Sequence, residues 1–336
     1  MREKHPMFSW TVIATTGERF SDFAPYVASV NGAGTVAFQA ALRDGGTSVF
    51  TGDGGAVTEV AGIALLAGVS SHPDLNGAGV TSFYGDLATG GQGVFRLSDG
   101  RLETIADTRG PLASIGPLGP TVNEAGCVAF RADFATGASG IFVGDGATVT
   151  AIADAEDGWS RFHGLPVINN HGIVVFRADR EDGAEGIYAS RKGSIETVVE
   201  SGDVFETLAL FPSLNDAGTV AFAATLRAGG AGIFTVHDGR VTRIETDGAF
   251  ETFRGALITG TGAVVRIATP RGASLGLFAG SNPETDRILA LGDPLLSSTV
   301  TDFAANPVSV NAAGHVAVRA TLADCRQLIL RADPVG

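Results

Sequence analysis

One eight-residue phrase, repeated along the chain, constrains the fold more than any other feature of this sequence. The phrase Asn-Gly-Ala-Gly-Thr-Val-Ala-Phe occupies residues 31–38 and returns with substitutions six times, at residues 76–83, 123–130, 169–176, 215–222, 259–266 and 311–318. The last two copies are the most altered. The step from Asn31 to Asn311 averages about 47 residues, and periods of 20–50 residues are typical of repeat architectures. The chain is therefore predicted to consist of seven similar structural units.

Each unit is predicted to contain four strands, as the third copy illustrates. Its apolar and β-branched segments, separated by turns at Gly126 and Asp145-Gly146, predict strands over residues 119–123, 127–133, 140–143 and 148–153. No unit contains the 3.6-residue apolar period of an amphipathic helix. Four antiparallel strands at this period are typical of a propeller blade. The apolar character of both strand faces, as in Val128-Ala-Phe130, fits sheets stacked face to face.

The two ends of the chain indicate how the ring closes. The seventh unit ends soon after its third strand, at Leu330, whereas the segment Trp10–Ala14 resembles the fourth strands of the other units. We therefore expect an all-β, seven-bladed β-propeller, a single domain over residues 1–336. Residues 7–19 are expected to supply the outer strand of the last blade, which removes open sheet edges. The blades are expected to begin near residues 20, 63, 111, 159, 204, 250 and 300.

The repeated phrase resembles the motif of a family of NxxGxxAF tandem-repeat β-propeller proteins, named for that phrase. The resemblance covers nearly the whole chain and implies the propeller architecture, but it carries no assigned chemistry. Many members of that family are bacterial, secreted and anchored at the surface. This sequence departs from them because it shows neither an export signal nor a C-terminal anchor.

Composition narrows the classes of partner. The net charge of −13 argues against nucleic acid and anionic membranes, both of which need a basic surface, and favours a neutral or cationic ligand. No apolar run reaches transmembrane length. We expect a cytoplasmic monomer that binds a small molecule, with no cofactor and no metal.

Residues that differ between repeats are the candidates for a site, because shared residues serve the blade. The connections into the innermost strands carry different polar residues at one rim: Tyr26, His72, His163, Arg254 and Asn306. Trp159, Arg161 and Phe253 lie close to them in sequence and are suited to stacking on a ligand. Histidine is a general base near neutral pH, and arginine binds carboxylate or phosphate. The alternative is that these are solvated loop residues without a common target.

The second strands carry another polar pattern, two residues apart. Arg131/Asp133 and Arg177/Asp179 share a strand face and predict ion pairs between blades, since buried charges must be paired. The second blade has Tyr84 and Asp86 instead. Together with His72 these would form a cluster able to carry out acid–base chemistry.

Three functions are compatible with these features. The first is an enzyme of lyase, cyclase or isomerase type at the channel mouth, with His72, Tyr84, Asp86 and His163 as catalytic candidates. Tyr26, Trp159, Arg161, Phe253, Arg254, Asn306, Arg131 and Arg177 would then bind its substrate. The second is a non-catalytic module that binds a peptide or protein. The third is a structural or surface-display protein.

Overall fold

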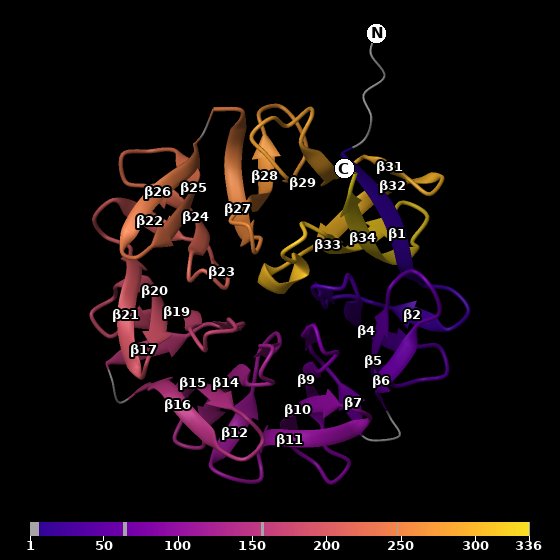
Figure 1. Cartoon of the computed structure of the whole chain (residues 1–336), viewed down its shortest axis with the longest axis vertical. Helices are drawn as coiled ribbons and strands as arrows, with labels where there is room; N and C mark the ends of the chain where they lie inside the picture. Colours follow the sequence, from indigo (N-terminus) through magenta and orange to yellow (C-terminus); the bar gives the residue numbers. More distant parts are fainter. Residues whose placement is uncertain (1–6, 63–65, 156–157, 247, 336) are drawn as a thin grey trace.

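The computed structural model describes residues 7–62, 66–155, 158–246 and 248–335, and it places seven antiparallel sheets around a central axis (Figure 1). The predicted all-β, seven-bladed propeller is therefore confirmed. The expected blade start near residue 63 lies outside the described residues. Among the described residues, no helix is long and apolar enough to cross a membrane.

The strands of the first four blades follow in chain order. Blade 1 contains β2 (Phe20–Asp22), β3 (Ser29–Val30), β4 (Val36–Leu42), β5 (Thr47–Gly52) and β6 (Thr58–Ala61). Blade 2 contains β7 (Gly68–Val69), β8 (Asp74–Leu75), β9 (Thr81–Asp86), β10 (Gln92–Ser98) and β11 (Arg101–Asp107). Blade 3 contains β12 (Leu112–Ile115), β13 (Thr121–Val122), β14 (Val128–Phe134), β15 (Ser139–Gly144) and β16 (Val149–Asp154). Blade 4 contains β17 (Trp159–Phe162), β18 (Val167–Ile168), β19 (Val174–Arg180), β20 (Glu185–Arg191) and β21 (Ser194–Glu200).

The remaining three blades are less uniform. Blade 5 contains β22 (Phe205–Leu208), β23 (Ser213–Leu214), β24 (Val220–Leu226), β25 (Ala231–His237) and β26 (Arg240–Thr246). Blade 6 contains β27 (Phe250–Ile258), β28 (Val264–Pro270), β29 (Gly276–Phe278) and β30 (Arg287–Ala290). Blade 7 contains β31 (Pro294–Leu295), β32 (Ser298–Ala304), the 3-10 helix η2 (Pro307–Ser309), β33 (Val316–Leu322), β34 (Gln327–Pro334) and β1 (Phe8–Thr15).

The first strand of most blades is interrupted halfway along, with its first half towards the periphery of the ring, as β22 and β23 show for blade 5 (Figure 1). In blade 3, β12 pairs with the end of β14 and β13 with its beginning, so that residues 116–120 leave the sheet between them. Blades 1, 2, 4 and 5 have the same arrangement, and η2 occupies the corresponding place in blade 7. Blade 6 differs because β27 is continuous. We call these excursions, which join the two halves of the first strand, the inner loops.

The amino-terminal strand closes the ring, as predicted. β1 pairs antiparallel with β34, and Trp10 lies opposite Ala332. An ion pair supports the closure, since Arg331 Nε contacts Asp333 Oδ1 at 2.5 Å while Thr11 Oγ1 donates to Asp333 Oδ2 at 2.5 Å. Arg331 also donates to the carbonyl oxygen of Gly34 in blade 1. The two chain ends therefore meet in one blade, with β1 as the edge strand that covers β34.

The asparagine that opens each repeat links neighbouring blades. Its Oδ1 accepts backbone N–H groups within the turn, as Asn31 does from Ala33 and Thr35. Its Nδ2 donates to the carbonyl oxygen of the next blade's motif asparagine, or of Thr259 in blade 6, over 2.7–3.3 Å. Thr259 breaks this series of bonds, because its hydroxyl bonds to Thr261 instead. The repeat motif is thus explained by blade assembly and carries no ligand chemistry of its own.

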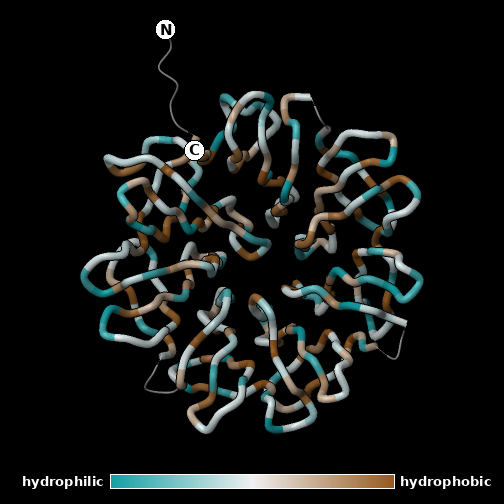
Figure 2. Tube along the Cα trace, turned by 180° about the vertical axis from the view of Figure 1, so that it is seen from behind, coloured by the Kyte–Doolittle hydropathy of each residue, from teal (hydrophilic) through white to brown (hydrophobic). Residues whose placement is uncertain are grey.

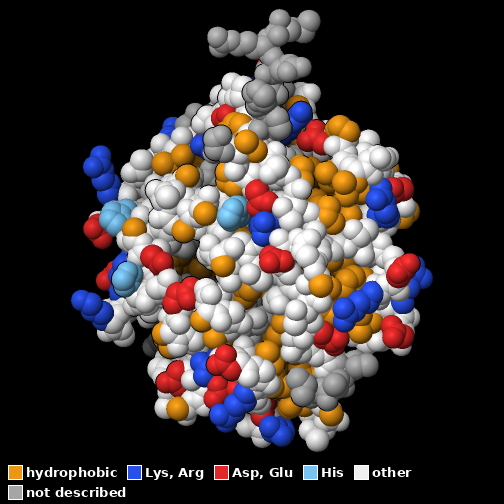
Figure 3. Space-filling model, turned by 45° about the vertical axis from the view of Figure 1, so that its right-hand side comes forward, with side chains coloured by type: hydrophobic (Ala, Val, Ile, Leu, Met, Phe, Trp, Pro, Cys, Tyr) orange, Lys and Arg blue, Asp and Glu red, His pale blue; other side chains and the backbone are white. Residues whose placement is uncertain are grey.

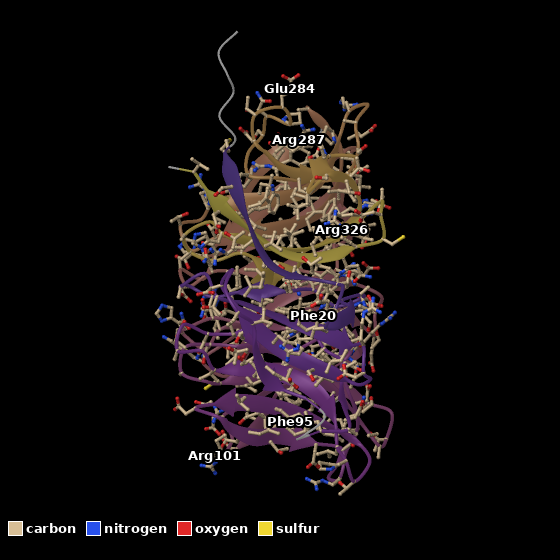
Figure 4. The ribbon with its side chains drawn as sticks, turned by 90° about the vertical axis from the view of Figure 1, so that its right-hand side faces the viewer. Phe20, Phe95, Arg101, Glu284, Arg287 and Arg326 are labelled. Atoms are coloured by element: carbon tan, nitrogen blue, oxygen red, sulfur yellow. The ribbon has the colours of Figure 1, made fainter. Side chains whose placement is uncertain are left out.

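The motif phenylalanine forms the core of most blades. In four blades it stacks on an aromatic ring of the third strand, as Phe130 does on Phe142 with centroids 5.4 Å apart. Hydrophobic residues run along the strands and hydrophilic ones gather in the outer loops (Figure 2). Phe20 and Phe95 lie inside their blades, whereas Arg101 and Glu284 lie at the periphery (Figure 4). Burial of each such ring contributes about 1.5–3 kcal/mol.

Candidate functional site

One position at the start of the inner loops separates two blades from the other five. It follows the first half of the first strand. In blades 3 and 4 its backbone N–H donates to a carbonyl oxygen of the second strand, from His163 N to Arg177 O and from Gly116 N to Arg131 O, each at 3.0 Å. Across the seven blades it is occupied by Ala24, Ser70, Gly116, His163, Ala209, Arg254 and Ala304. Five blades carry a small residue, so His163 and Arg254 are not required by the blade.

His163 lies among charged side chains of blade 4. Its Nε2 lies 3.0 and 3.1 Å from the two oxygens of Asp179 and 2.7 Å from Nη1 of Arg177. The side chain is 13 % exposed, and burial holds the pKa of the imidazole below its ordinary value. Asp179 opposes this shift, whereas Arg177 and Arg161 reinforce it. The ring is therefore neutral at pH 7.

The charges around His163 form a network confined to blade 4. The guanidinium of Arg177 is buried and contacts Glu185, and its Nη1 lies 3.8 Å from Asp179 Oδ1. Its Nε is buried without a hydrogen-bond partner. Arg161 is exposed on β17, directly across the ladder from Asp179. Glu185 is not among the residues expected from the sequence. It lies directly across the β19–β20 ladder from Asp179, so pairing the second strand with the third in the sequence would have identified it.

In blade 3 the same arginine–aspartate pair is a structural clasp. Arg131 contacts both oxygens of Asp133, at 2.5 and 2.8 Å, and donates to the carbonyl oxygens of Gly116 at 2.6 Å and Phe162 at 3.1 Å. The sequence predicts ion pairs between blades. The structure places both ion pairs within single strands, and it is the carbonyl of Phe162 that links blade 3 to blade 4.

The predicted cluster of His72, Tyr84 and Asp86 is dispersed. His72 is buried, and its Nδ1 accepts the backbone N–H of Val27 in blade 1 at 2.7 Å. Burial and the charge of Arg319 lower the pKa of His72 to about 4. The Tyr84 side chain packs instead in the hydrophobic cluster between blades 2 and 3. The two rings therefore face different blade interfaces, and no contact joins either to Asp86 among the described residues.

Trp159 has structural surroundings as well. It is buried against Phe162, Phe176 and Tyr188, so it lies in the blade core and not at the rim where it was expected. It occupies the place of Phe20 and Phe205 in other blades, a correspondence that alignment of the first strands would have revealed.

The remaining three predicted binding residues come from blades 6, 7 and 1. Phe253 is half-buried and packs on Phe250. Asn306 is buried as the cap of η2, where its Oδ1 accepts Val308 N and its Nδ2 lacks a partner. Tyr26 is half-buried, with its ring edge-on to His72 at 5.5 Å between centroids. None of these residues contacts the His163 network in the described part of the molecule.

Open clefts are found away from this network. One of about 610 Å³ lies beside blade 6, lined by Arg271, Phe278 and Arg287 among others, and an apolar one of about 590 Å³ lies between blades 2 and 3. Neither is lined by any of the site residues that the sequence predicts. The charged side chains around His163 therefore do not line either cleft.

Comparison with known proteins supplies a family and a fold. A family described as a family of unknown function, DUF7453, matches residues 146–327, more than half of the chain. The chain belongs to this family. No curated protein sequence matches it. The NxxGxxAF family itself is not among the matches, so that resemblance stays a prediction.

Solved structures share the architecture at low sequence identity. An oligogalacturonate lyase in complex with manganese has a TM-score of 0.62 at 8 % identity, with 98 % of this DUF7453 chain and 99 % of that chain covered. A puromycin-hydrolyzing peptidase of Mycobacterium tuberculosis also has a TM-score of 0.62, at 15 % identity, over 93 % of this chain and 52 % of its own. The oligogalacturonate lyase of Vibrio parahaemolyticus has a TM-score of 0.60 at 9 % identity, covering 97 % and 98 %. These likenesses show the propeller fold. Within the described residues, no three His, Cys, Asp or Glu side chains come together in an arrangement that could hold a metal ion.

Proposed function

We propose that this protein binds a small organic molecule at the inner side of blade 4 and acts on it by acid–base chemistry, as a lyase or isomerase does. The observation that carries the proposal is the setting of His163. Its Nε2 lies between an obligate donor, Arg177, and an acceptor carboxylate, Asp179. A blade that needed only a small residue here carries instead a half-buried imidazole with a charged partner on each side.

This arrangement provides a partner for Nε2 in either tautomer of the neutral ring. With the proton on Nε2, the ring donates to Asp179 and its Nδ1 is able to accept a proton; with the proton on Nδ1, Nε2 accepts from Arg177. The lowered pKa of His163 keeps the ring neutral near pH 7, which leaves it ready to accept a proton. In the described residues Nδ1 has no hydrogen-bond partner, nor is it one of the buried unpartnered atoms, so it is the ring atom open to a ligand. Asp179 and Arg177 then act as positioning residues for His163.

The choice of enzyme over binding module also has support from the fold. Solved propellers with this architecture include proteins named as a lyase and a peptidase, so the scaffold accommodates catalysis. Analogy between folds carries no substrate, because function resides in the particular site residues. The reaction class therefore rests on His163 and its neighbours.

Solvent deuterium exchange tests the proposal on a panel of compounds, so the substrate need not be identified first. The protein is incubated in D2O with small organic acids, amides and sugars, and loss of carbon-bound protons is followed by NMR. We expect exchange in at least one compound. His163→Gln should slow it by at least about 100-fold, the usual contribution of a general base, and Asp179→Asn by less. His237→Gln, at an exposed hairpin, is the matched control and should leave the rate unchanged. Failure of every compound to exchange, or equal exchange by His163→Gln, would refute the enzyme and favour the binding module.

A further inference from the structure

The apolar cleft of about 590 Å³ lies between blades 2 and 3, which are neighbours at the bottom of Figure 1. It is lined by β11 of blade 2, by β16 of blade 3 and by two rings of blade 3, Phe134 and Phe142, whose centroids are 5.5 Å apart. Apolar side chains also reach the surface in patches bordered by charged ones (Figure 3), so exposure alone assigns no role. The shape of this cleft does.

Two residues of blade 3 are smaller than their counterparts in other blades, and this opens the cleft. Leu112 lies at a position of the first strand that is aromatic in four other blades: Phe20, Trp159, Phe205 and Phe250. Ala151 lies opposite Phe142, where the other blades have larger residues: Glu59, Thr104, Thr197, Arg243, Arg287 and Val12. In the four blades with an aromatic first strand, that ring packs on the ring of the third strand. Blade 3 covers Phe142 with a leucine and a methyl group instead.

The strand beside the cleft has an open edge. β16 pairs with β15 and with no other strand in the described part of the chain, so the N–H and C=O groups of its far side are available for pairing. Val149 and Ala151 are exposed, and β16 has no charged residue before Asp154. The fourth strands of blades 1, 2, 4, 5 and 6 all carry charged residues, which protect an edge from pairing with other chains. β1 is also uncharged, but the larger Trp10 and Val12 stand at the two equivalent places.

The chain around β16 is acidic. Between Arg131 and Arg161 it contains five acidic residues and no Lys or Arg. Asp145 precedes β16 in its hairpin and Asp154 ends the strand, so a carboxylate stands at each end. A basic segment is therefore attracted to this edge. A second copy of this chain would instead bring the same acidic stretch and its net charge of −13.

We propose that blade 3 binds an extended segment of a partner protein, which adds as a further strand to β16 and inserts a large apolar side chain into the cleft over Phe142. In strand addition, main-chain hydrogen bonds supply affinity and pockets for alternate side chains supply specificity. The segment has apolar residues at every second position, because only one face of the added strand meets the cleft. It has Lys or Arg at both ends, beside Asp145 and Asp154. This interface is separate from the His163 network, which lines no part of the cleft.

A synthetic peptide, acetyl-Lys-Thr-Val-Thr-Phe-Thr-Val-Lys-amide, is the probe. Calorimetric titration of the intact protein should show saturable binding, and NMR should show slower hydrogen exchange of the β16 amides when the peptide is bound. Three altered peptides have alanine in place of phenylalanine, glutamate in place of both lysines, or proline in place of the central threonine. Each should bind at least about tenfold more weakly, because it lacks the anchor, the attracting charge or a main-chain donor.

Two protein variants introduce residues that other blades already have. Ala151→Glu copies Glu59 of blade 1 and covers Phe142, so it should weaken binding at least about tenfold although it adds a negative charge. Thr150→Glu copies Glu103 of blade 2 on the opposite face of the strand. It is the matched control and should not weaken binding. Thermal unfolding of both variants checks that they fold as the natural protein does.

The remaining outcomes would overturn the proposal. Absence of peptide binding, or equal binding to the Ala151→Glu variant, would remove the docking site. Equal affinity of the proline peptide, or of N-acetylphenylalanine amide, would mean that the cleft takes an apolar group without strand addition. A dimer in sedimentation that Ala151→Glu dissociates would assign the edge to a second copy. None of these results bears on the deuterium-exchange test of His163.

Discussion

Blades 3 and 4 carry the same Arg-x-Asp pattern on their second strands, yet they use it differently. In blade 3, Arg131 directs its donors to Asp133 and to two backbone carbonyls, one of them in the next blade. In blade 4, Arg177 contacts His163 and leaves its Nε unpaired. The two blades differ at the position that faces the arginine, Gly116 in one and His163 in the other. This residue does not decide alone, since Arg319 in blade 7 faces Ala304 and also leaves its Nε unpaired. A motif shared by two repeats therefore has no fixed role until its cross-strand neighbour is known.

The largest expected effect is a difference in the free energy of unfolding between the alanine variants of Arg131 and Arg177. Arg131→Ala removes the donor to two carbonyls and leaves the half-buried Asp133 carboxylate with Ser114 Oγ as its remaining side-chain donor, which we expect to cost about 3–4 kcal/mol. Arg177→Ala should cost about 1–2 kcal/mol, because Glu185 is 44 % exposed and recovers its hydration. Urea denaturation of both variants measures the difference. Equal losses would show that the two arginines do the same structural work.

The sequence was sufficient for the architecture because the architecture is what the repeats share. The glycine with positive φ recurs because every blade makes the same turn, and the asparagine and phenylalanine recur because most blades make the same inter-blade bond and the same core. The closing strand could also be predicted, because Trp10–Ala14 resembles the strand that the last blade lacks.

The site was only partly predictable, because the register of strand pairing decides which side chains meet. His163, Arg161 and Arg177 are all candidates from the sequence. Arg161 and His163 are two residues apart, but nothing in the linear sequence places Arg177 beside them, because it lies on β19. Tyr84 is expected beside His72, and the alternation of side chains across β9 directs it to the opposite interface of blade 2. Trp159 is expected to contact a ligand because only one blade has tryptophan there, although the position is aromatic in several blades.

The link that each blade makes to the next offers a second comparison, between Asp74 and Thr121. Each accepts the backbone N–H of the following blade's inner strand, Val122 for Asp74 at 2.9 Å and Ile168 for Thr121 at 3.1 Å. Burial raises the pKa of Asp74 from 3.8 to about 7. Between these values the unfolded chain has released the proton that the folded protein retains, so stability falls as pH rises through this window and stays lowered above it.

Asp74→Thr should remove that penalty and keep the link. We expect a gain of about 2–4 kcal/mol at pH 8, falling towards zero as the pH approaches 4. Denaturation at pH 5, 6, 7 and 8 measures it. The reciprocal Thr121→Asp should import the same pH dependence between blades 3 and 4. A gain from Asp74→Thr that is equal at every pH would contradict the assignment to ionisation.

Gly116 and His163 can also be compared through their backbones. Gly116 has φ +104°, a conformation in which L-residues are strained, whereas His163 is not among the residues with positive φ. Gly116→Ala should therefore cost about 1–2 kcal/mol. Gly110→Ala, with open space at its Cα and an ordinary φ, is the control and should be nearly neutral. A neutral Gly116→Ala would mean that blade 3 tolerates a side chain where blade 4 has its histidine.

The smallest effect is the sharpest test of why the blades differ. His163→Ala places in blade 4 the residue that blades 1, 5 and 7 carry, and it should change stability by about 1 kcal/mol or less. Loss of the imidazole allows Arg177 to move towards the carbonyl of Leu208, as Arg131 reaches that of Phe162. Arg319 in blade 7, which faces Ala304, has the other outcome, with its Nε unpaired. Arg177→Ala should then cost more in the His163→Ala background than in the natural protein, by about 1 kcal/mol, which a double-mutant cycle in urea resolves. Additive losses would mean that the histidine does not divert the arginine, and the contrast between blades 3 and 4 would need another cause.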